Sequence, residues 1–277
     1  MQVKEYGILY IVATPIGNLE DITLRAIRVL ENVDLIAAED TRHTLKLLNH
    51  LNISKPMISY HRHNEEIRVD GLIKELKEGK NVAVVSDAGT PGICDPGEII
   101  IKKCIDENII VVPIPGACAM INALIVSGID TEEFIFLGFL PLNKKNRRNK
   151  LEEIRKSNKT IILYEAPHKL KNTLNDLKNI LEKRKIVIAR EITKIHEEYI
   201  RGTVEEILNI AGNLKGEMII IIEKNKNNTE ENHFNKLTLE EHFDYYKNKG
   251  LDKKEIIKKI AKDRNVSKND IYKYFIK

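Results

Sequence analysis

The fold is decided by the stretch Val82-Ala83-Val84-Val85-Ser86-Asp87-Ala88-Gly89-Thr90-Pro91-Gly92-Ile93-Cys94-Asp95-Pro96-Gly97. Four β-favouring residues end in a Ser-Asp step, and the next ten residues contain three glycines and two prolines before an apolar helical pattern begins at Ile99. The pattern predicts a buried strand, a shaped loop and the start of a helix. Asp87 then lies just past the carboxyl end of the strand, where open α/β sheets place their ligands.

The loop does not match the known phosphate-binding templates. Its glycines at 89, 92 and 97 are not spaced as G-x-G-x-x-G, and no G-K-[ST] follows them. A loop of backbone groups with one carboxylate instead suits a polar, uncharged or cationic small molecule. The same residues also fit a stiff turn in which Asp87 or Asp95 caps the next helix, and both interpretations stay open.

Strands and helices alternate five times in the first half of the chain. The expected strands cover residues 8–13, 33–38, 56–60, 80–85 and 109–112. This alternation predicts a mostly parallel sheet with helices on both faces. Four of the loops at the strand ends carry Pro, Gly or charged residues, which we expect to converge on one site.

The pattern changes after residue 133 and predicts a second α/β unit. The expected strands cover residues 134–140, 160–164, 186–190, 197–202 and 217–222. We expect some antiparallel pairing, because the connection between Arg190 and Tyr199 is too short for a crossover helix. The expected domains are therefore residues 1–117 and 118–225, followed by a linker and helical tail over 226–277.

Composition narrows the class of protein. The 277 residues are 42% hydrophobic, without an apolar run of 18 residues or a charged-then-apolar leader, so nothing suggests membrane spanning or secretion. Cys94, Cys104 and Cys118 are unequally spaced and form no C-x-x-C. This usage predicts reduced thiols in a cytoplasmic protein and argues against a zinc site.

The tail carries the net charge of the chain. Residues 226–277 contain 13 Lys and Arg against 9 Asp and Glu, so their net charge of +4 equals that of the whole chain. Three short helical patterns follow the polar linker, and the last two, with Lys268 and Lys273 on the final one, resemble a helix-turn-helix. A nucleic-acid contact is one interpretation, and a solvated, packing or dimerisation surface is the alternative.

The sequence resembles the tetrapyrrole methylase superfamily. The resemblance rests on motifs that include Ala38-Glu39-Asp40-Thr41-Arg42 and Tyr164-Glu165-Ala166-Pro167-His168, together with residues 13–21, 59–65, 85–97, 115–117, 136–141 and 189–202. It implies two α/β domains with S-adenosylmethionine in the cleft between them, plus a small C-terminal helical extension. Within the superfamily the likeness is to enzymes that methylate a cytidine ribose 2′-hydroxyl in the decoding region of 16S rRNA, as free RNA or small ribosomal subunit, and a homodimer is expected.

The resemblance also implies roles for individual residues. The implied cofactor contacts are Pro15, Asp87, Ala88, Gly89, Thr90, Ala117, Cys118, Tyr164 and Ala166, and the implied substrate contacts are Asn18, His61, Asn64, Lys144, Arg147 and Glu165. We expect Asp40 to act as base or positioner and Arg42 as phosphate clamp, although a helix cap and a structural ion pair are the simpler interpretations. His61 and His63 lack a partner at ligand spacing, so no metal is expected.

Four positions depart from the superfamily pattern. Cys94 and Cys118 stand where serine is expected, Arg62 where an acidic residue is common, and Asp130 where proline is usual. The cysteines keep the size of serine and weak hydrogen bonding, so we expect cofactor binding to survive.

The sequence also leaves two alternatives to an rRNA methyltransferase open. A precorrin-type methylase would keep the fold and methylate a tetrapyrrole carbon, whereas a regulator would sense a metabolite and bind DNA through the tail. The polar motifs at the strand ends lie in the body and outnumber those of the tail, which favours an enzyme. The basic run from Lys144 to Lys150 favours an RNA substrate over an acidic macrocycle, although a solvated helix start would look the same.

Overall fold

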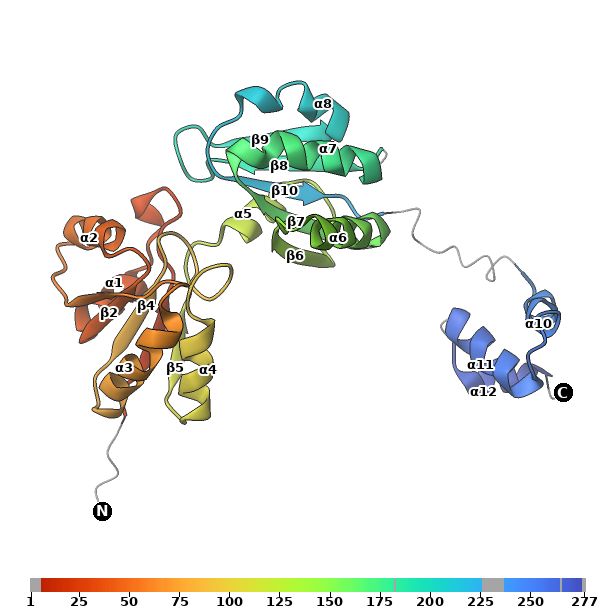
Figure 1. Ribbon diagram of the computed structural model, residues 1–277, viewed down its shortest axis with the longest axis horizontal. Helices are drawn as coiled ribbons and strands as arrows, with labels where there is room; N and C mark the ends of the chain where they lie inside the picture. Colours follow the sequence, from red (N-terminus) through yellow and green to blue (C-terminus); the bar gives the residue numbers. More distant parts are fainter. Residues whose placement is uncertain (1–5, 182, 226–236, 265, 276–277) are drawn as a thin grey trace, which may run out of the picture.

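The computed structural model describes residues 6–181, 183–225, 237–264 and 266–275, and its first sheet is parallel throughout (Figure 1). The strand order is β3-β2-β4-β1-β5. The strands are β1 (Leu9–Val12), β2 (Leu35–Ala38), β3 (Met57–Ser59), β4 (Val82–Val85) and β5 (Val111–Ile114). All four residues of β4 are buried, as the apolar run predicted. The parallel sheet expected from the alternating pattern is therefore confirmed.

Helices cover both faces of this sheet. They are α1 (Leu24–Asn32), α2 (Thr41–His50), α3 (Glu65–Lys77) and α4 (Glu98–Asp106), with a 3-10 turn, η1, at Leu19–Asp21. Leu72 of α3 and Ile100 of α4 pack in the core on one face, while Leu30 of α1 and Leu48 of α2 pack in the core on the other. This two-sided burial leaves the carboxyl ends of the strands as the open edge.

The second sheet is mixed, with the order β6-β7-β10-β8-β9. Its strands are β6 (Phe134–Phe139), β7 (Thr160–Glu165), β8 (Lys185–Arg190), β9 (Glu198–Thr203) and β10 (Met218–Ile222). β6 runs parallel to β7, and the other three pairings are antiparallel. The expectation of partly antiparallel pairing is confirmed, and the β8–β9 hairpin is the element that the short connection predicted.

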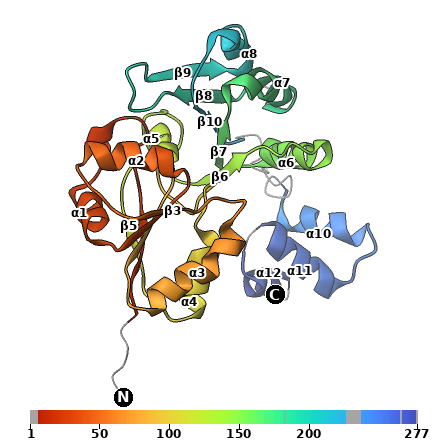
Figure 2. The same ribbon diagram turned by 60° about the vertical axis from the view of Figure 1, so that its left-hand side comes forward.

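The helices of the second lobe also form two layers. α6 (Lys144–Lys156), α7 (Leu170–Leu181) and α8 (Val204–Leu208) pack on one face, with 3-10 turns η2 (Pro167–Lys169) and η3 (Ala211–Asn213). α5 (Ala119–Ile125) packs on the other face through Ala123 and Leu124. Figures 1 and 2 show the two lobes meeting near α5.

The tail has a small core of its own. α10 (Leu239–Lys247), α11 (Lys253–Asp263) and α12 (Lys268–Phe275) pack around Tyr246, Ile256, Ile260 and Ile271. The Ser267 hydroxyl accepts from the backbone N–H groups of Asn269 and Asp270 at 3.2 and 3.4 Å and so caps α12. Most of the predicted linker lies outside the described residues. Over the described ranges, no helix combines the length and the apolarity needed to span a bilayer.

One of the two interpretations that the sequence left open for this loop is wrong. The residue that caps α4 is Gly97, without a side-chain hydrogen bond, so neither Asp87 nor Asp95 caps that helix. The Asp87 carboxylate instead accepts from a backbone N–H at the end of β2. Asp87 and Asp95 instead line the cavity described below.

Candidate functional site

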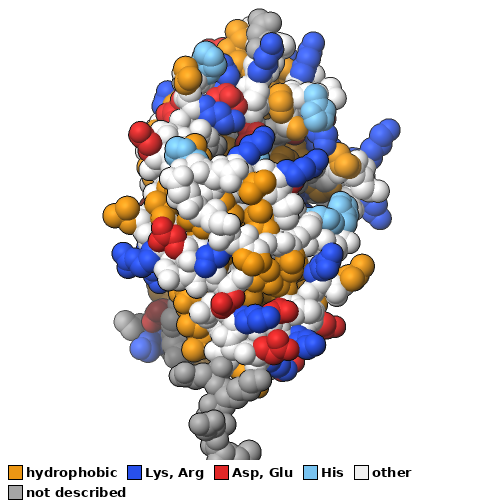
Figure 3. Space-filling view, turned by 90° about the vertical axis from the view of Figure 1, so that its left-hand side faces the viewer, with side chains coloured by type: hydrophobic (Ala, Val, Ile, Leu, Met, Phe, Trp, Pro, Cys, Tyr) orange, Lys and Arg blue, Asp and Glu red, His pale blue; other side chains and the backbone are white. Residues whose placement is uncertain are grey.

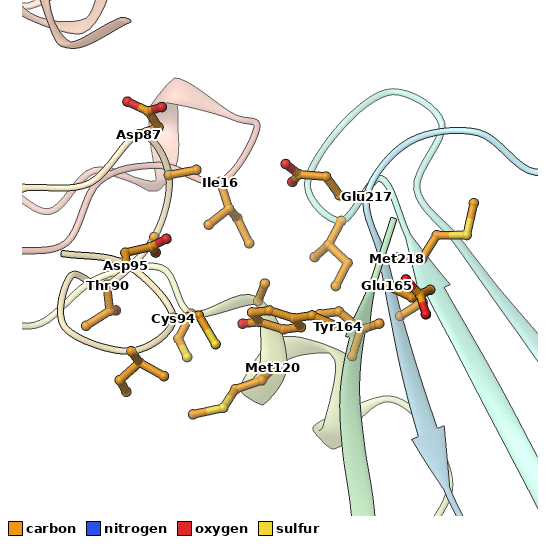
Figure 4. A pocket seen from close by; sticks show the side chains of 18 of the residues that line it. Ile16, Asp87, Thr90, Cys94, Asp95, Met120, Tyr164, Glu165, Glu217 and Met218 are labelled. Carbon is orange, nitrogen blue, oxygen red and sulfur yellow. The ribbon is translucent and has the colours of Figure 1, made fainter. Parts of the chain in front are cut away.

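A cavity of about 430 Å³ lies between the two lobes, at the open strand ends (Figure 4). Its lining comes from both lobes, with the larger share from the second. The lining residues are Ile16, Glu39, Asp87, Ala88, Gly89, Thr90, Ile93, Cys94, Asp95, Cys118, Ala119, Met120, Phe139, Tyr164, Glu165, Ala166, Pro167, Ala189, Glu191, Ile192, Lys194, Glu217, Met218 and Ile219. Its size is that of a small-molecule site.

The loop after β4 forms the near wall and is fixed by backbone hydrogen bonds. Thr14 and Gly89 exchange two of them, at 2.9 and 3.0 Å. Gly89 has φ +80°, and an added Cβ would lie 3.3 Å from Ile16 Cγ2. The Thr90 hydroxyl donates to the Ala117 carbonyl at 3.2 Å, which joins the loop to the end of β5. Glycine at position 89 therefore permits both the positive φ of this turn and its close packing against Ile16.

A buried carboxylate holds the far end of the same loop. Glu65, 7% exposed at the start of α3, accepts from the backbone N–H of Gly97 at 2.8 Å. Within the loop, the Gly92 N–H donates to the Pro96 carbonyl at 3.1 Å. The loop is thus closed on itself and anchored to a neighbouring helix. Sequence reasoning missed this anchor, because Glu65 looks like an ordinary first-turn helix residue.

Carboxylates dominate the electrostatics of the cavity. Burial, together with the nearby charges of Glu39 and Asp87, raises the pKa of Asp95 to about 6, against the opposing effect of Arg62. Burial also raises the pKa of Glu39, although its Oε2 accepts from the Asp87 N–H at 3.2 Å. With Glu217 also in the lining, the cavity favours a ligand that carries positive charge.

The opposite wall is aromatic and apolar. The ring of Tyr164 meets those of Phe136 and Phe139 edge-on, at centroid distances of 4.9 and 5.7 Å. In Figure 4 the Tyr164 ring reaches into the cavity near Cys94, with Met120 beside it. Burial raises the pKa of the Tyr164 phenol, so the hydroxyl stays neutral. Such a wall suits a flat heterocycle.

The structure brings most of the expected cofactor residues together. The expected residues that line the cavity are Asp87, Ala88, Gly89, Thr90, Cys118, Tyr164 and Ala166, and Glu165, expected at the substrate, joins them. Ala117 contributes its carbonyl to the loop instead, and Pro15 lines a separate hollow. Glu39, Asp95 and Glu217 were missed, although Glu39 belongs to the Glu-Asp-Thr-Arg motif and its neighbours were singled out.

Asp40 and Arg42 form a pair outside the cavity. Asp40 caps α2 by accepting from the Arg42 N–H at 2.8 Å, and its Oδ2 lies 2.7 Å from Arg42 Nη2. The Arg42 guanidinium holds the pKa of the Asp40 carboxyl well below its usual range. The Arg42 side chain is 89% exposed. The cap and the ion pair, the simpler interpretations from the sequence, are both confirmed.

The remaining expected substrate residues are more dispersed. Asn64 bonds to the His61 N–H at 2.8 Å and to the Ser59 carbonyl at 3.2 Å, which folds the loop after β3. Asn18 caps η1. None of these side chains lines the cavity. Among the described residues, no group of three or more His, Cys, Asp or Glu side chains is arranged to hold a metal.

The basic run on α6 divides into two kinds of side chain. Lys144 is exposed, whereas Arg147 donates to Asp176 at 2.7 Å and to the Thr173 hydroxyl at 2.8 Å. That hydroxyl in turn donates to Glu165. Figure 3 shows Lys, Arg and His side chains over the upper half of another face, which includes the first lobe. Exposed cations thus occur on both lobes.

Comparison with known proteins gives consistent matches. The family model "Tetrapyrrole (Corrin/Porphyrin) Methylases" matches residues 8–208. The chain is 50% identical to the "Ribosomal RNA small subunit methyltransferase I" of Halalkalibacterium halodurans, over 99% of this chain and 96% of the relative. It is 49% identical to the protein of the same name from Bacillus subtilis, over 97% and 94%.

Solved structures share the fold at low identity. A diphthine synthase matches with a TM-score of 0.62 and 14% identity, covering 78% of this chain and 90% of that one. The uroporphyrin-III-C-methyltransferase of Thermus thermophilus matches with a TM-score of 0.56 and 20% identity, covering 79% and 94%. The two-lobed α/β architecture is therefore shared with proteins of different substrates.

Proposed function

This chain belongs to the tetrapyrrole methylase family, and on that premise we propose that it is an S-adenosylmethionine-dependent methyltransferase acting on 16S rRNA. The proposed product is the 2′-O-methylated ribose of cytidine 1402 in the decoding region. The observation that carries the proposal is the cavity, whose carboxylates and aromatic wall suit a cationic ligand with a heterocycle. The names of relatives 49–50% identical over nearly the whole chain support the substrate.

The residues of the cavity fit this cofactor. When bound, S-adenosylmethionine supplies a methyl group on a positively charged sulfur, already activated for transfer. Asp95 and Glu39 would balance that charge, and the loop residues Ala88, Gly89 and Thr90 that line the cavity would hold the amino acid or ribose part. Neutral Tyr164 would pack against the adenine and exclude water. Because the ligand has no phosphate, the loop needs no phosphate cradle.

RNA would approach over exposed cations such as Arg42 on the first lobe and Lys144 on α6. Arg42, held by Asp40, is proposed as the phosphate clamp, with Asp40 as its positioner. Lys144 would contact backbone phosphates flanking the target nucleotide. His61, Asn64 and Asn18 keep a proposed supporting role, since they shape the loops beside this surface.

We further propose a cytoplasmic homodimer with domain bounds at residues 117 and 225. Ile121 and Ile125 are exposed on α5, Val126 is exposed directly after it, and Phe134 and Ile135 are exposed on the edge strand β6. A second copy would cover this apolar surface, because an uncovered sheet edge beside it invites pairing. The oligomeric state, measured by light scattering, tests this part.

A methyl-transfer assay with labelled S-adenosylmethionine tests the function. Small ribosomal subunits, naked 16S rRNA and a tetrapyrrole precursor are offered in parallel. Label in alkali-resistant dinucleotides from rRNA is the expected result, since a 2′-O-methyl blocks alkaline cleavage. Label only in the tetrapyrrole would favour the precorrin-type alternative. Binding of the cofactor without transfer, together with binding of duplex DNA by the tail, would favour the regulator.

A further inference from the structure

A buried carboxylate lies directly behind one wall of the cavity. Glu165, the last residue of β7, is 5% exposed, and its neighbours Tyr164 and Ala166 line the cavity. Successive side chains of a strand point to opposite faces of the sheet. Figure 4 shows the Tyr164 ring extending into the cavity and Glu165 on the other side of β7. Although Glu165 belongs to the lining of the cavity, its carboxylate turns toward the helical layer that contains α7.

Two protein donors bind this carboxylate. Its Oε1 accepts from the Ala166 N–H at 2.9 Å, and its Oε2 accepts from the hydroxyl of Thr173, a residue of α7 that is 1% exposed. The Ala166 carbonyl in turn accepts from the backbone N–H groups of Lys169 and Leu170, at 2.9 and 3.2 Å. Both backbone polar groups of Ala166 are thus held, and the turn after β7 is fixed beside the cavity.

Arg147 of α6 completes this chain of hydrogen bonds. Its Nη2 donates to Thr173 Oγ1 at 2.8 Å, and its Nε donates to Asp176 at 2.7 Å. A threonine hydroxyl has one proton, which cannot point at another donor. Because Arg147 occupies the acceptor side of the hydroxyl, the Thr173 proton is directed at Glu165. The guanidinium also lies one hydroxyl away from the buried carboxylate, which lowers the cost of burying that charge.

From this geometry we propose that Thr173 and Arg147 are positioning residues for the cofactor. They act through Glu165, which holds the turn at Ala166 beside the Tyr164 ring. A binding wall needs such support, because a small displacement of its residues weakens the fit to the ligand. The inference rests on the proposed function, since the ligand of this wall is taken to be S-adenosylmethionine.

The contacts with RNA that the resemblance implied for Arg147 and Glu165 fit this geometry less well. Arg147 already uses two guanidinium nitrogens within the fold, and its side chain is only 20% exposed. Lys144 and Arg148 on the same helix are exposed and better placed to meet phosphates. The Glu165 carboxylate is turned toward α7, where its partner is a protein hydroxyl.

Thr173→Val tests the inference, because it keeps the branched shape of the side chain and removes the hydroxyl. We expect the Kd for S-adenosylhomocysteine, measured by calorimetric titration, to rise about tenfold, because the buried carboxylate loses a donor. Thr173→Ser retains a hydroxyl and should recover most of the affinity. Arg147→Ala should also weaken binding. The double variant should bind little worse than Thr173→Val alone, because both residues act in one chain.

Thr160→Val is the matched control. Thr160 lies at the other end of β7, is 0% exposed, and donates its hydroxyl to the Asp130 carbonyl at 2.6 Å. Its loss should lower the melting temperature by a few degrees, as in Thr173→Val. The Kd for S-adenosylhomocysteine should stay at the wild-type value, because this end of the strand is remote from the cavity. The control thereby separates loss of stability from loss of positioning.

The outcomes distinguish this inference from the proposed function. Unchanged affinity in Thr173→Val, an equal loss of affinity in Thr160→Val, or no recovery in Thr173→Ser would each overturn the positioning role. If Thr173→Val does not fold, the same titration with Arg147→Ala decides, and an unchanged Kd there would overturn the inference. A wild-type protein that binds neither S-adenosylmethionine nor S-adenosylhomocysteine would instead reject the proposed function itself.

Discussion

The backbone N–H of Asp40 donates a hydrogen bond of 3.1 Å to the carboxylate of Asp87. The first residue lies at the end of β2 and the second at the end of β4, which are neighbouring strands. In return, the Asp87 N–H donates to the Glu39 carboxylate at 3.2 Å. These two hydrogen bonds fix the loop after β4 against the start of α2. The geometry of the cavity and that of the Asp40–Arg42 pair are therefore coupled.

Replacing Asp87 by Asn should separate the charge of this residue from its hydrogen bond. An Asn oxygen can still accept from the Asp40 N–H, so we expect the melting temperature to stay within a few degrees. The lost negative charge should weaken S-adenosylmethionine binding about tenfold, which corresponds to about 1.4 kcal/mol. Calorimetric titration measures the effect, with Asp106→Asn on the exposed end of α4 as control. Unchanged affinity would mean that the Asp87 charge does not face the ligand.

Cofactor affinity should fall in mildly acidic solution because of Asp95. Its pKa is raised to about 6, so the carboxyl becomes neutral as the pH falls through 6 and its attraction for the sulfonium is lost. We expect the Kd for S-adenosylmethionine to rise by up to about tenfold between pH 7 and pH 5. The Kd for the neutral thioether product, S-adenosylhomocysteine, should change less over this pH range. In Asp95→Asn the Kd for S-adenosylmethionine should depend much less on pH. An equal pH response for both ligands would contradict this assignment.

The same raised pKa makes a prediction for stability. A carboxyl that binds its proton more tightly in the folded state favours folding when protonated, and that contribution is lost as the pH rises from about 4 to about 6. Asp95→Asn should therefore stabilise the ligand-free protein at pH 8 by about 1 kcal/mol and have little effect near pH 4. Thermal unfolding at the two pH values measures this. A variant that is destabilised at pH 8 would show that the Asp95 charge is well compensated in the fold.

Much of the fold could be predicted because its signals are local. The apolar run of β4, the turn residues after it and the alternation of strands and helices specified a parallel sheet. The loop from Arg190 to Tyr199 likewise specified the hairpin of the second sheet. Several residues that the resemblance implied for the cofactor also line the cavity, at the ends of β4 and β7.

Other features depend on contacts between distant segments and left no local signal. Glu65 looks like a helix-start residue, and its bond to Gly97 exists only because α3 packs beside α4. Arg147 looks like one more cation of a basic run, yet α7 supplies Asp176 and Thr173 as its partners. Pairings of this kind follow from packing, which no period or motif in one segment encodes.

Removing the Glu65 carboxylate should loosen the loop after β4, which this carboxylate anchors at Gly97. In Glu65→Leu the buried N–H of Gly97 would lose its acceptor, which typically costs about 1–3 kcal/mol. We expect a lower melting temperature and a larger Kd for S-adenosylmethionine. Glu65→Gln keeps an acceptor oxygen and should behave much more like wild type in both measurements. If both variants lose cofactor affinity equally, the charge of Glu65 rather than its hydrogen bond is what matters.

Arg147 and Arg148 are neighbours on α6, and we expect replacement by Ala to affect stability at the first and RNA binding at the second. Arg147 is only 20% exposed and bonded to α7, so its loss should destabilise the fold by about 1 kcal/mol and lower the melting temperature by about 2–4 °C. Arg148 is exposed, so its loss should leave the melting temperature unchanged while weakening RNA binding. In Arg148→Ala, the slope of log Kd for RNA against the logarithm of the salt concentration should fall by about the amount that one phosphate contact contributes. Equal effects of the two substitutions on RNA binding, with no difference in melting temperature, would mean that the whole basic run acts as one solvated surface.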